Sequence, residues 1–245
     1  MEADPTTRGR SVRGLVLLLG VALFCFSAAA GATAGRPVTF PSSDGVLLSA
    51  MLYEAGSRPG PGIVLVHMLG RSKDEWVAIA ERLQDSGLTT LAVDLRGHGQ
   101  SAGNGSDLPA MVGDVRAALT WLSTRPFVQP SVLAVVGASL GANLAALAAA
   151  DDPQVRIVAM VSPSLDYRGV RLDAAVMRKL ANRAVWMAAS VEDPYALRSI
   201  RELVSDNAVH EQRLSPLRGH GTPLLMADAD LARALVDWLK ARLIF

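Results

Sequence analysis

Residues 132–145 read VLAVVGASLGANLA, an apolar stretch that leads through Gly-Ala-Ser-Leu-Gly into a run rich in alanine. The apolar half predicts a buried strand, and the alanine-rich half predicts a helix. A strand that leads directly into a helix must turn sharply, and glycines at 137 and 141 relieve the crowding there because they lack a Cβ atom. Ser139 is therefore either a small residue in a structural turn or a nucleophile held out on a strained corner. Residues elsewhere in the chain distinguish the two.

Strands and amphipathic helices alternate through most of the chain, which predicts a mostly parallel sheet covered by helices on both faces. Residues 36–56 alternate apolar and polar side chains around Ser-Ser-Asp-Gly and predict an antiparallel hairpin. Six further strands are expected at 62–68, 89–96, 132–139, 155–164, 184–192 and 210–217. Helices are expected at 72–87, 107–126, 140–150, 173–181, 194–206 and 223–243. The helix at 107–126 is opened by Asp107, with Pro109 just inside it. The stretch between Ser164 and Ala184 is too short for a lid domain, so an active site here would be open.

The charge of the chain is nearly balanced, so any basic patch would have to be local. The 245 residues carry 24 Lys and Arg against 23 Asp and Glu, a formal net charge of +1. This balance offers no electrostatic basis for binding nucleic acid or an anionic surface. Half of the residues are hydrophobic, which in a chain of this length is enough for one domain with a full core. We expect that domain at residues 37–245.

The first 34 residues differ in kind from the rest. Three arginines between positions 8 and 13 precede the apolar run GLVLLLGVALFCFSAAA, and the small residues GATAG follow it. This pattern predicts a secretory signal peptide at 1–34, cleaved near Ala34, and hence a secreted or periplasmic protein. An uncleaved membrane anchor is the alternative, because the run is at the short limit for spanning a bilayer. The only cysteine, Cys25, lies in this run, so the mature domain would contain none.

Candidate reactive groups follow three of the expected strands. In α/β sheets, functional groups collect on the loops at the carboxyl ends of the strands. These loops carry Ser139, Asp193 in VEDP and His220 in RGHGT, while the strand at 62–68 leads into the loop HMLG. A serine hydroxyl is a weak nucleophile unless a base takes its proton, and His220, between two glycines, is the best-placed base. Asp193 would accept a hydrogen bond from the other ring nitrogen.

The Gly-Ala-Ser-Leu-Gly turn and the chain order Ser, Asp, His resemble the α/β-hydrolase superfamily, whose nucleophile elbow has this strand, turn and helix context. The segment DLRGHGQS at 94–101 resembles a turn common in that superfamily. The resemblance covers essentially the whole mature chain and is nearest to the small capless carboxylesterases and dienelactone-hydrolase-like enzymes. It implies an α/β-hydrolase fold with an eight-stranded, mostly parallel sheet and no lid domain. It also implies Ser139 as nucleophile, His220 as base and Asp193 as acid, with no cofactor.

Two roles have more than one candidate. Asp166 occupies a position from which some members of the superfamily supply the acid, and Glu192 is adjacent to Asp193. The oxyanion hole is expected to use the amide of Leu140, at a helix N-terminus. By resemblance to the His-Gly loop of the superfamily, the amide of Leu69 is the second donor and that of Met68 the alternative. Met68 stands where many members have glycine.

Other conspicuous residues are expected to be structural. His67 lies in the expected oxyanion loop, His98 and Arg96 in the Arg-Gly-His-Gly turn, and His210 at the start of a strand. Solvated surface positions are expected for Asp74, Glu75, Asp151 and Asp152, and packing positions for Trp76, Trp121, Trp186 and Trp238. No His/Cys/Asp cluster has metal-ligand spacing, and the glycine-rich stretches lack the pattern of a phosphate loop or a dinucleotide site.

Together these features predict a secreted or periplasmic serine hydrolase that cleaves small-molecule carboxylic esters through an acyl-enzyme. Nucleic acid is not an expected partner, and a membrane is one only if the N-terminal segment stays uncleaved. A thioesterase or peptidase of the same fold is the nearest alternative, because this fold hosts many chemistries. A non-catalytic binding protein is a second alternative, although such a chain has no reason to keep all three groups at strand ends.

Overall fold

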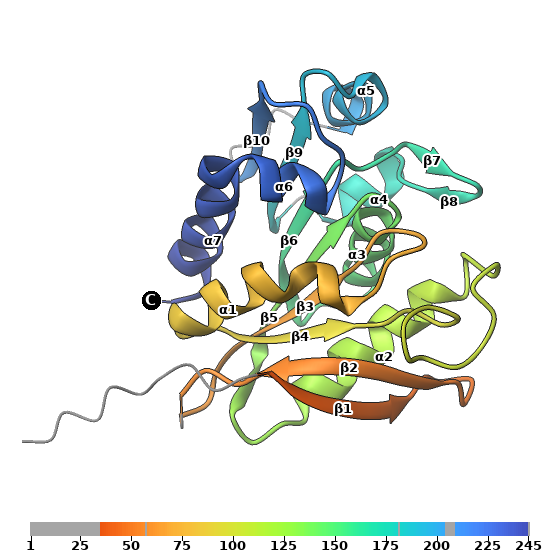
Figure 1. The fold of residues 1–245 in the computed structure, drawn as a ribbon, viewed down its shortest axis with the longest axis vertical. Coiled ribbons are helices and arrows are strands. Elements are labelled where there is room, and N and C mark those ends of the chain that lie inside the picture. The colour runs from red at the N-terminus through yellow and green to blue at the C-terminus, as the bar shows by residue number, and fades with distance from the viewer. Residues whose placement is uncertain (1–34, 57, 181, 204–208, 245) are drawn as a thin grey trace, which may run out of the picture. The chain divides into compact units, whose positions relative to one another are not determined.

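The computed structural model describes residues 35–56, 58–180, 182–203 and 209–244 (Figure 1). The predicted signal peptide, residues 1–34 with Cys25, lies outside these ranges. None of the helices within them is long and apolar enough to cross a membrane.

An eight-stranded sheet forms the centre of the fold, with the strand order β1-β2-β4-β3-β5-β6-β9-β10. The strands are β1 (Arg36–Pro41), β2 (Leu47–Tyr53), β3 (Gly60–Val66), β4 (Thr89–Val93), β5 (Val128–Ala138), β6 (Val155–Val161), β9 (Ala184–Ser190) and β10 (His210–Ser215). The β1–β2 and β2–β4 pairs are antiparallel, and every other neighbouring pair is parallel. The prediction of an eight-stranded, mostly parallel sheet is confirmed.

Helices cover both faces of this sheet (Figure 1). They are the 3₁₀ helix η1 (Lys73–Trp76), α1 (Val77–Asp85), α2 (Met111–Ser123), α3 (Leu140–Ala150), α4 (Ala174–Lys179), α5 (Pro194–Leu203), α6 (Thr222–Ala227) and α7 (Ala229–Leu243). Side chains of α2, α3, α4 and α5 pack on one face, and those of η1, α1, α6 and α7 pack on the other.

The central strands are buried on both faces because long runs of apolar residues occur in them. In β3, Val64 and Val66 pack with one layer of helices, while Ile63 and Leu65 pack with the other, and all four are fully buried. This division follows from the alternation of side chains along a strand. Because the central strands are parallel, their carboxyl ends lie together at one edge, where the loops with the candidate reactive groups begin.

Two helix boundaries differ from the prediction. The helix expected from Asp107 begins at Met111, after a turn in which the Asp107 carboxylate accepts a hydrogen bond from the Ala110 amide at 3.2 Å. The single helix expected at the C-terminal end is broken at Asp228 into α6 and α7. The Asp228 side chain caps α7 by accepting the Leu231 amide at 2.9 Å, which favours a new helix start there.

A short hairpin, which the sequence analysis did not predict, lies between β6 and β9. It consists of β7 (Asp166–Tyr167) and β8 (Val170–Arg171), and it leads into α4. The Asn143 side chain of α3 holds it by donating hydrogen bonds to the carbonyls of Ser164, at 2.8 Å, and Val170, at 2.9 Å. Within the described residues this segment forms no lid domain, as expected.

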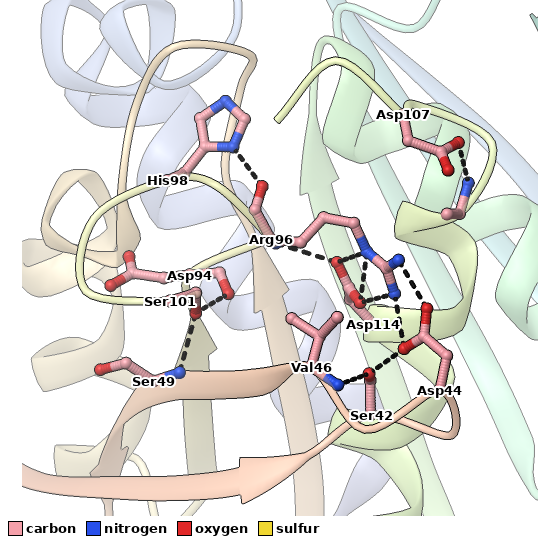
Figure 2. A network of polar contacts seen from close by, with 11 residues as sticks. Ser42, Asp44, Val46, Ser49, Asp94, Arg96, His98, Ser101, Asp107 and Asp114 are labelled. Atoms are coloured by element: carbon pink, nitrogen blue, oxygen red, sulfur yellow. Dashed lines mark hydrogen bonds and ion pairs between the residues drawn. The ribbon is translucent and has the colours of Figure 1, made fainter. Parts of the chain in front are cut away.

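A buried arginine ties the β1–β2 hairpin to the turn after β4 and to α2 (Figure 2). The Arg96 guanidinium lies 2.6 Å from Asp114, which is fully buried, and 2.7 Å from the exposed Asp44. Asp114 also accepts the Arg96 amide at 2.9 Å. The Nδ1 atom of His98 lies 2.9 Å from the Arg96 carbonyl. Arg96 and His98 therefore have the structural role expected for that turn.

We expect Asp114→Ala to lower the free energy of unfolding by about 3 kcal/mol, because it leaves the buried Arg96 guanidinium with only one, exposed, carboxylate partner. Urea denaturation followed by circular dichroism measures the loss. Asp151→Ala is the matched control, since Asp151 pairs with Arg116 and Lys179 at the surface, and its loss should stay below about 1 kcal/mol. Equal losses in the two variants would contradict the structural role of Asp114.

Candidate active site

Ser139 lies at the turn between β5 and α3, where the backbones leave no room for side chains. A Cβ atom on Gly137 would lie 2.0 Å from the Gly141 carbonyl oxygen, and one on Gly141 would lie 2.4 Å from the Val66 carbonyl oxygen. Only glycine fits at these two positions. Ser139 itself has a φ of 53° and a ψ of −120°, which a non-glycine residue adopts only under strain. Ser139 thus occupies the strained corner that the two glycines predict.

A chain of hydrogen bonds links Ser139 to His220 and His220 to Asp193. The Nε2 atom of His220 lies 2.8 Å from the Ser139 Oγ atom, and Nδ1 lies 2.5 Å from the Asp193 Oδ2 atom. The other oxygen of Asp193 accepts the Ala196 amide at 3.1 Å in the first turn of α5, so the carboxylate is held from both sides. The Asp193 side chain is 12% exposed and that of His220 is 48% exposed. The histidine is therefore open to solvent, while its carboxylate partner is shielded.

The two alternative acids lie elsewhere. Asp166 forms an ion pair at 3.0 Å with the arginine of β8, within its own hairpin. Glu192 pairs at 3.1 Å with the exposed Arg218. Of the three carboxylates, only Asp193 makes a hydrogen bond to His220 among the described residues.

The loop after β3 lies beside the start of α3, since a Cβ atom on Gly141 would also lie 2.5 Å from the His67 carbonyl oxygen. In this loop, the Met68 amide donates a hydrogen bond to the Glu75 carboxylate at 2.8 Å. The Met68 amide is therefore not free to bind an oxyanion. Among the described residues, none accepts a hydrogen bond from the amides of Leu69 or Leu140. The amides of Leu69 and Leu140 are therefore free to donate a hydrogen bond.

His67 fixes the same loop from its other side. Its buried Nε2 atom accepts the Leu95 amide at 3.0 Å, so Nδ1 carries the proton and donates to the Met68 carbonyl at 2.7 Å. Burial lowers the pKa of His67 to about 4, which keeps the ring neutral at physiological pH. His67 is thus a structural residue of the loop and not a second base.

A buried ion pair holds the far end of the loop. The carboxylate of Asp94, which is fully buried, accepts hydrogen bonds from the Lys73 amide at 2.7 Å and the Lys73 ammonium at 2.5 Å. It also accepts the Gln100 amide at 2.9 Å. Several hydrogen bonds of this kind offset the cost of removing a carboxylate from water. The segment at 94–101 therefore supports the loop that carries Leu69.

Two residues of this region have roles that the sequence analysis missed. Glu75, expected to be solvated, is largely buried and accepts the Met68 amide. Ser162, fully buried with a φ of 51°, accepts the Gly221 amide on its Oγ atom at 2.9 Å. A signal for Ser162 was its place just beyond a buried strand. Glu75 has no such signal, because acidic residues in a first helical turn are commonly solvated.

The chain of Ser139, His220 and Asp193 is arranged for proton transfer. Nε2 of His220 is placed to take the Ser139 hydroxyl proton, and Asp193 is placed to stabilise the imidazolium that forms. Within the described ranges, no three His, Cys, Asp or Glu side chains are grouped so as to hold a metal ion.

Comparisons with known proteins show that this chain is similar to a hydrolase family, a polyketide transferase and a thiohydrolase. A family model described as Hydrolase_4, serine aminopeptidase, S33 matches residues 58–229. The polyketide transferase ATR5 of Stachybotrys chlorohalonatus is 33% identical over 186 residues, 73% of this chain and 62% of that protein. The thiohydrolase apmlB of Arthrinium phaeospermum is 36% identical over 137 residues, 52% of this chain and 42% of that protein. The chain spans less than two-thirds of the length of these relatives.

The fold comparison is consistent with this match. The crystal structure of the α/β-hydrolase GrgF from Penicillium sp. sh18 superposes with a TM-score of 0.72 and 18% sequence identity. The superposition covers 87% of this chain and 100% of that chain. At this identity the likeness concerns the fold alone, and it confirms the α/β-hydrolase fold.

We expect Ser162→Ala to lower the free energy of unfolding by about 1 to 3 kcal/mol, because it leaves the Gly221 amide without its acceptor in a buried place. Urea denaturation measures the loss, and hydrogen–deuterium exchange should show faster exchange of the Gly221 amide. Ser131→Ala, at an exposed position of β5, is the control and should change neither quantity. Unchanged exchange at Gly221 in Ser162→Ala would refute the role of this hydrogen bond.

Proposed function

Because the chain belongs to the Hydrolase_4 (serine aminopeptidase, S33) family of the α/β-hydrolase superfamily, we propose that it is a serine hydrolase that cleaves carboxylic esters through an acyl-enzyme. The observation that carries this proposal is the hydrogen-bonded chain of Ser139, His220 and Asp193, at 2.8 and 2.5 Å. A structural turn needs a small residue at 139, but it needs neither a histidine on the Ser139 hydroxyl nor a shielded carboxylate behind that histidine.

In the proposed acylation step, His220 Nε2 takes the Ser139 proton as Oγ attacks the ester carbonyl carbon. The carbonyl oxygen becomes an oxyanion, which the amides of Leu140 and Leu69 stabilise. The imidazolium is stabilised by Asp193 and then gives its proton to the alkoxide as the carbon–oxygen bond breaks. The products of this step are the free alcohol and an acyl group esterified to Ser139.

In the proposed deacylation step, water takes the place of the alcohol. His220 accepts a proton as the water oxygen attacks the acyl carbon, and it returns that proton to Ser139 as the acid leaves. The half-exposed His220 ring supports this step, because water can reach it without movement of a lid. These residues carry both steps, so the proposal includes no cofactor.

Thioester cleavage is a second candidate, favoured by the similarity to the thiohydrolase apmlB. The same groups apply to a thioester, except that the leaving group is a thiolate, which needs little protonation to depart. Transfer of the acyl group to another alcohol is a variant of the deacylation step, and the similarity to the polyketide transferase ATR5 supports testing it. Peptides form a further substrate class for the test, because the family description is that of an aminopeptidase.

We also propose that the domain is exported. The sequence of residues 1–34 alone supports this proposal, with a basic start, an apolar centre and an Ala-x-Ala end. The proposed substrate is a small-molecule ester outside the cytoplasm.

A fluorophosphonate probe should form an adduct on Ser139, because such probes react with serines that a base has activated. Peptide mass mapping locates the adduct. The turnover rates of esters, thioesters and peptides then identify the substrate class. Ser139→Ala should abolish both labelling and turnover, and His220→Ala should reduce labelling by at least about a thousandfold. No adduct on a wild-type protein shown to be folded would favour a non-catalytic binding protein instead.

The identity of the acid is tested by exchanging carboxylates for amides. Asp193→Asn should reduce kcat by about a thousandfold or more, because an amide no longer stabilises the imidazolium or holds the active tautomer. Asp166→Asn, within its own ion-paired hairpin, should retain most of the activity and is the matched control. The reverse result would assign the acid role to Asp166.

A further inference from the structure

Glu75 is a largely buried carboxyl group that the proposed chemistry does not use. It lies in η1, between the loop after β3 and the residue Thr222 at the start of α6. Its Oε1 atom accepts the Met68 amide at 2.8 Å. Its Oε2 atom is buried without a hydrogen bond of ordinary geometry among the described residues. Burying a carboxyl group with so few hydrogen bonds costs stability.

The loops on both sides of Glu75 carry candidate active-site groups. Met68 immediately precedes Leu69, whose amide is the candidate second oxyanion donor. Thr222 lies two residues after His220, and its side chain is only 2% exposed. Glu75 and Thr222 line the same cavity, although no hydrogen bond joins them among the described residues. Glu75 is therefore bound to the loop of Met68 and faces a cavity that the loop of His220 also lines.

The loop of Met68 and the loop of Gly221 are in direct contact, which restricts the movement of both. A Cβ atom on Gly221 would lie 2.0 Å from the Met68 sulfur atom and 3.5 Å from the Ala138 Cβ atom. The loop of Gly221 thus packs directly on the Met68 side chain, beside the residue that precedes Ser139. A shift of Met68 would be transmitted to both the oxyanion loop and the loop of His220.

The hydrogen bond to Glu75 determines which amide of the loop is free. With the Met68 amide bound to Glu75 and the Met68 carbonyl bound to His67, the peptide groups on both sides of Met68 are held. The next amide, that of Leu69, is left without an acceptor among the described residues. Without an acceptor at Glu75, the Met68 amide would be a partly buried donor with no partner, and a loop in that state relaxes to find one.

The neighbouring space allows such a relaxation. Glu75 and Thr222 line a cavity of about 230 Å³ whose other walls include Ile79 and Leu225. Removing the Glu75 side chain would enlarge this cavity on the side of Met68. Burial raises the pKa of Glu75, opposed by the Met68 amide and by Thr222. A carboxyl oxygen accepts the Met68 amide in either protonation state, so a glutamine at this position would preserve the contact.

We propose that Glu75 is a positioning residue, which binds the Met68 amide so that this loop presents the Leu69 amide, and not that of Met68, to the oxyanion. The inference deepens the proposed function and rests on it for the effect on catalysis. Its effect on the loop does not depend on any activity.

The test compares Glu75→Ala and Glu75→Gln with Glu81→Ala and Glu81→Gln, which change an exposed glutamate of α1. With short-chain p-nitrophenyl esters, Glu75→Ala should reduce kcat by about 10- to 100-fold, because a misplaced oxyanion donor costs that much. KM should change less than about threefold, since the ester ground state gains little from the oxyanion hole. Glu75→Gln should recover kcat to within about threefold of wild type, and the Glu81 variants should match wild type.

Hydrogen–deuterium exchange tests the hydrogen bond between Glu75 and the Met68 amide without requiring that any ester is turned over. The Met68 amide should exchange on the order of tenfold faster in Glu75→Ala than in wild type, and at the wild-type rate in Glu75→Gln. Unchanged exchange in Glu75→Ala would overturn the proposal even if no ester is turned over. Equal loss of kcat in the Ala and Gln variants, in parallel with a lower unfolding temperature, would also overturn it. Failure of wild type itself to react with a fluorophosphonate counts instead against the proposed function.

Discussion

The close approach of β5 and α3 is the constraint on which the candidate active site depends. The two backbones come so near that a Cβ atom at position 137 would lie 2.0 Å from a carbonyl oxygen of the helix. Only a sharp turn connects a strand and a helix at that distance, and Ser139 at its tip has a φ of 53°. The strain at Ser139 is maintained because packing on both faces of β5 determines where the helix starts. The hydroxyl and the first free amide of the helix are thereby presented at the same edge of the sheet.

The loops that meet this turn are held mainly by buried polar groups. Asp94 binds Lys73, His67 binds the Met68 carbonyl, and Ser162 binds the Gly221 amide. In a low-dielectric interior such contacts are strong when every partner is present and costly when one is missing. These groups do not take part in the proposed reaction. Their role is to place the reacting groups, which are joined to one another by hydrogen bonds at 2.8 and 2.5 Å.

The described residues form an open site, and this bears on what would accept the acyl group in the proposed reaction. Between β6 and β9 the chain forms only a short hairpin and α4, and the His220 side chain remains 48% exposed. Water has direct access to such a ring, which favours hydrolysis over transfer unless an acceptor occupies the same space. The names of the similar proteins include both outcomes, a thiohydrolase and a polyketide transferase.

The sequence alone predicted the α/β fold, the turn at Ser139 and the three groups of the hydrogen-bonded chain as candidates. These predictions depend on local physics: hydrophobic periodicity, glycines that relieve a crowded turn, and loops that follow strands. Only the tertiary structure brought Asp193 rather than Asp166 to His220, and only it showed Glu75 on the Met68 amide. The reason is that a carboxylate in the sequence has the same chemistry wherever it lies. Its partner is decided by which distant backbone and side chain the fold brings within about 3 Å of it.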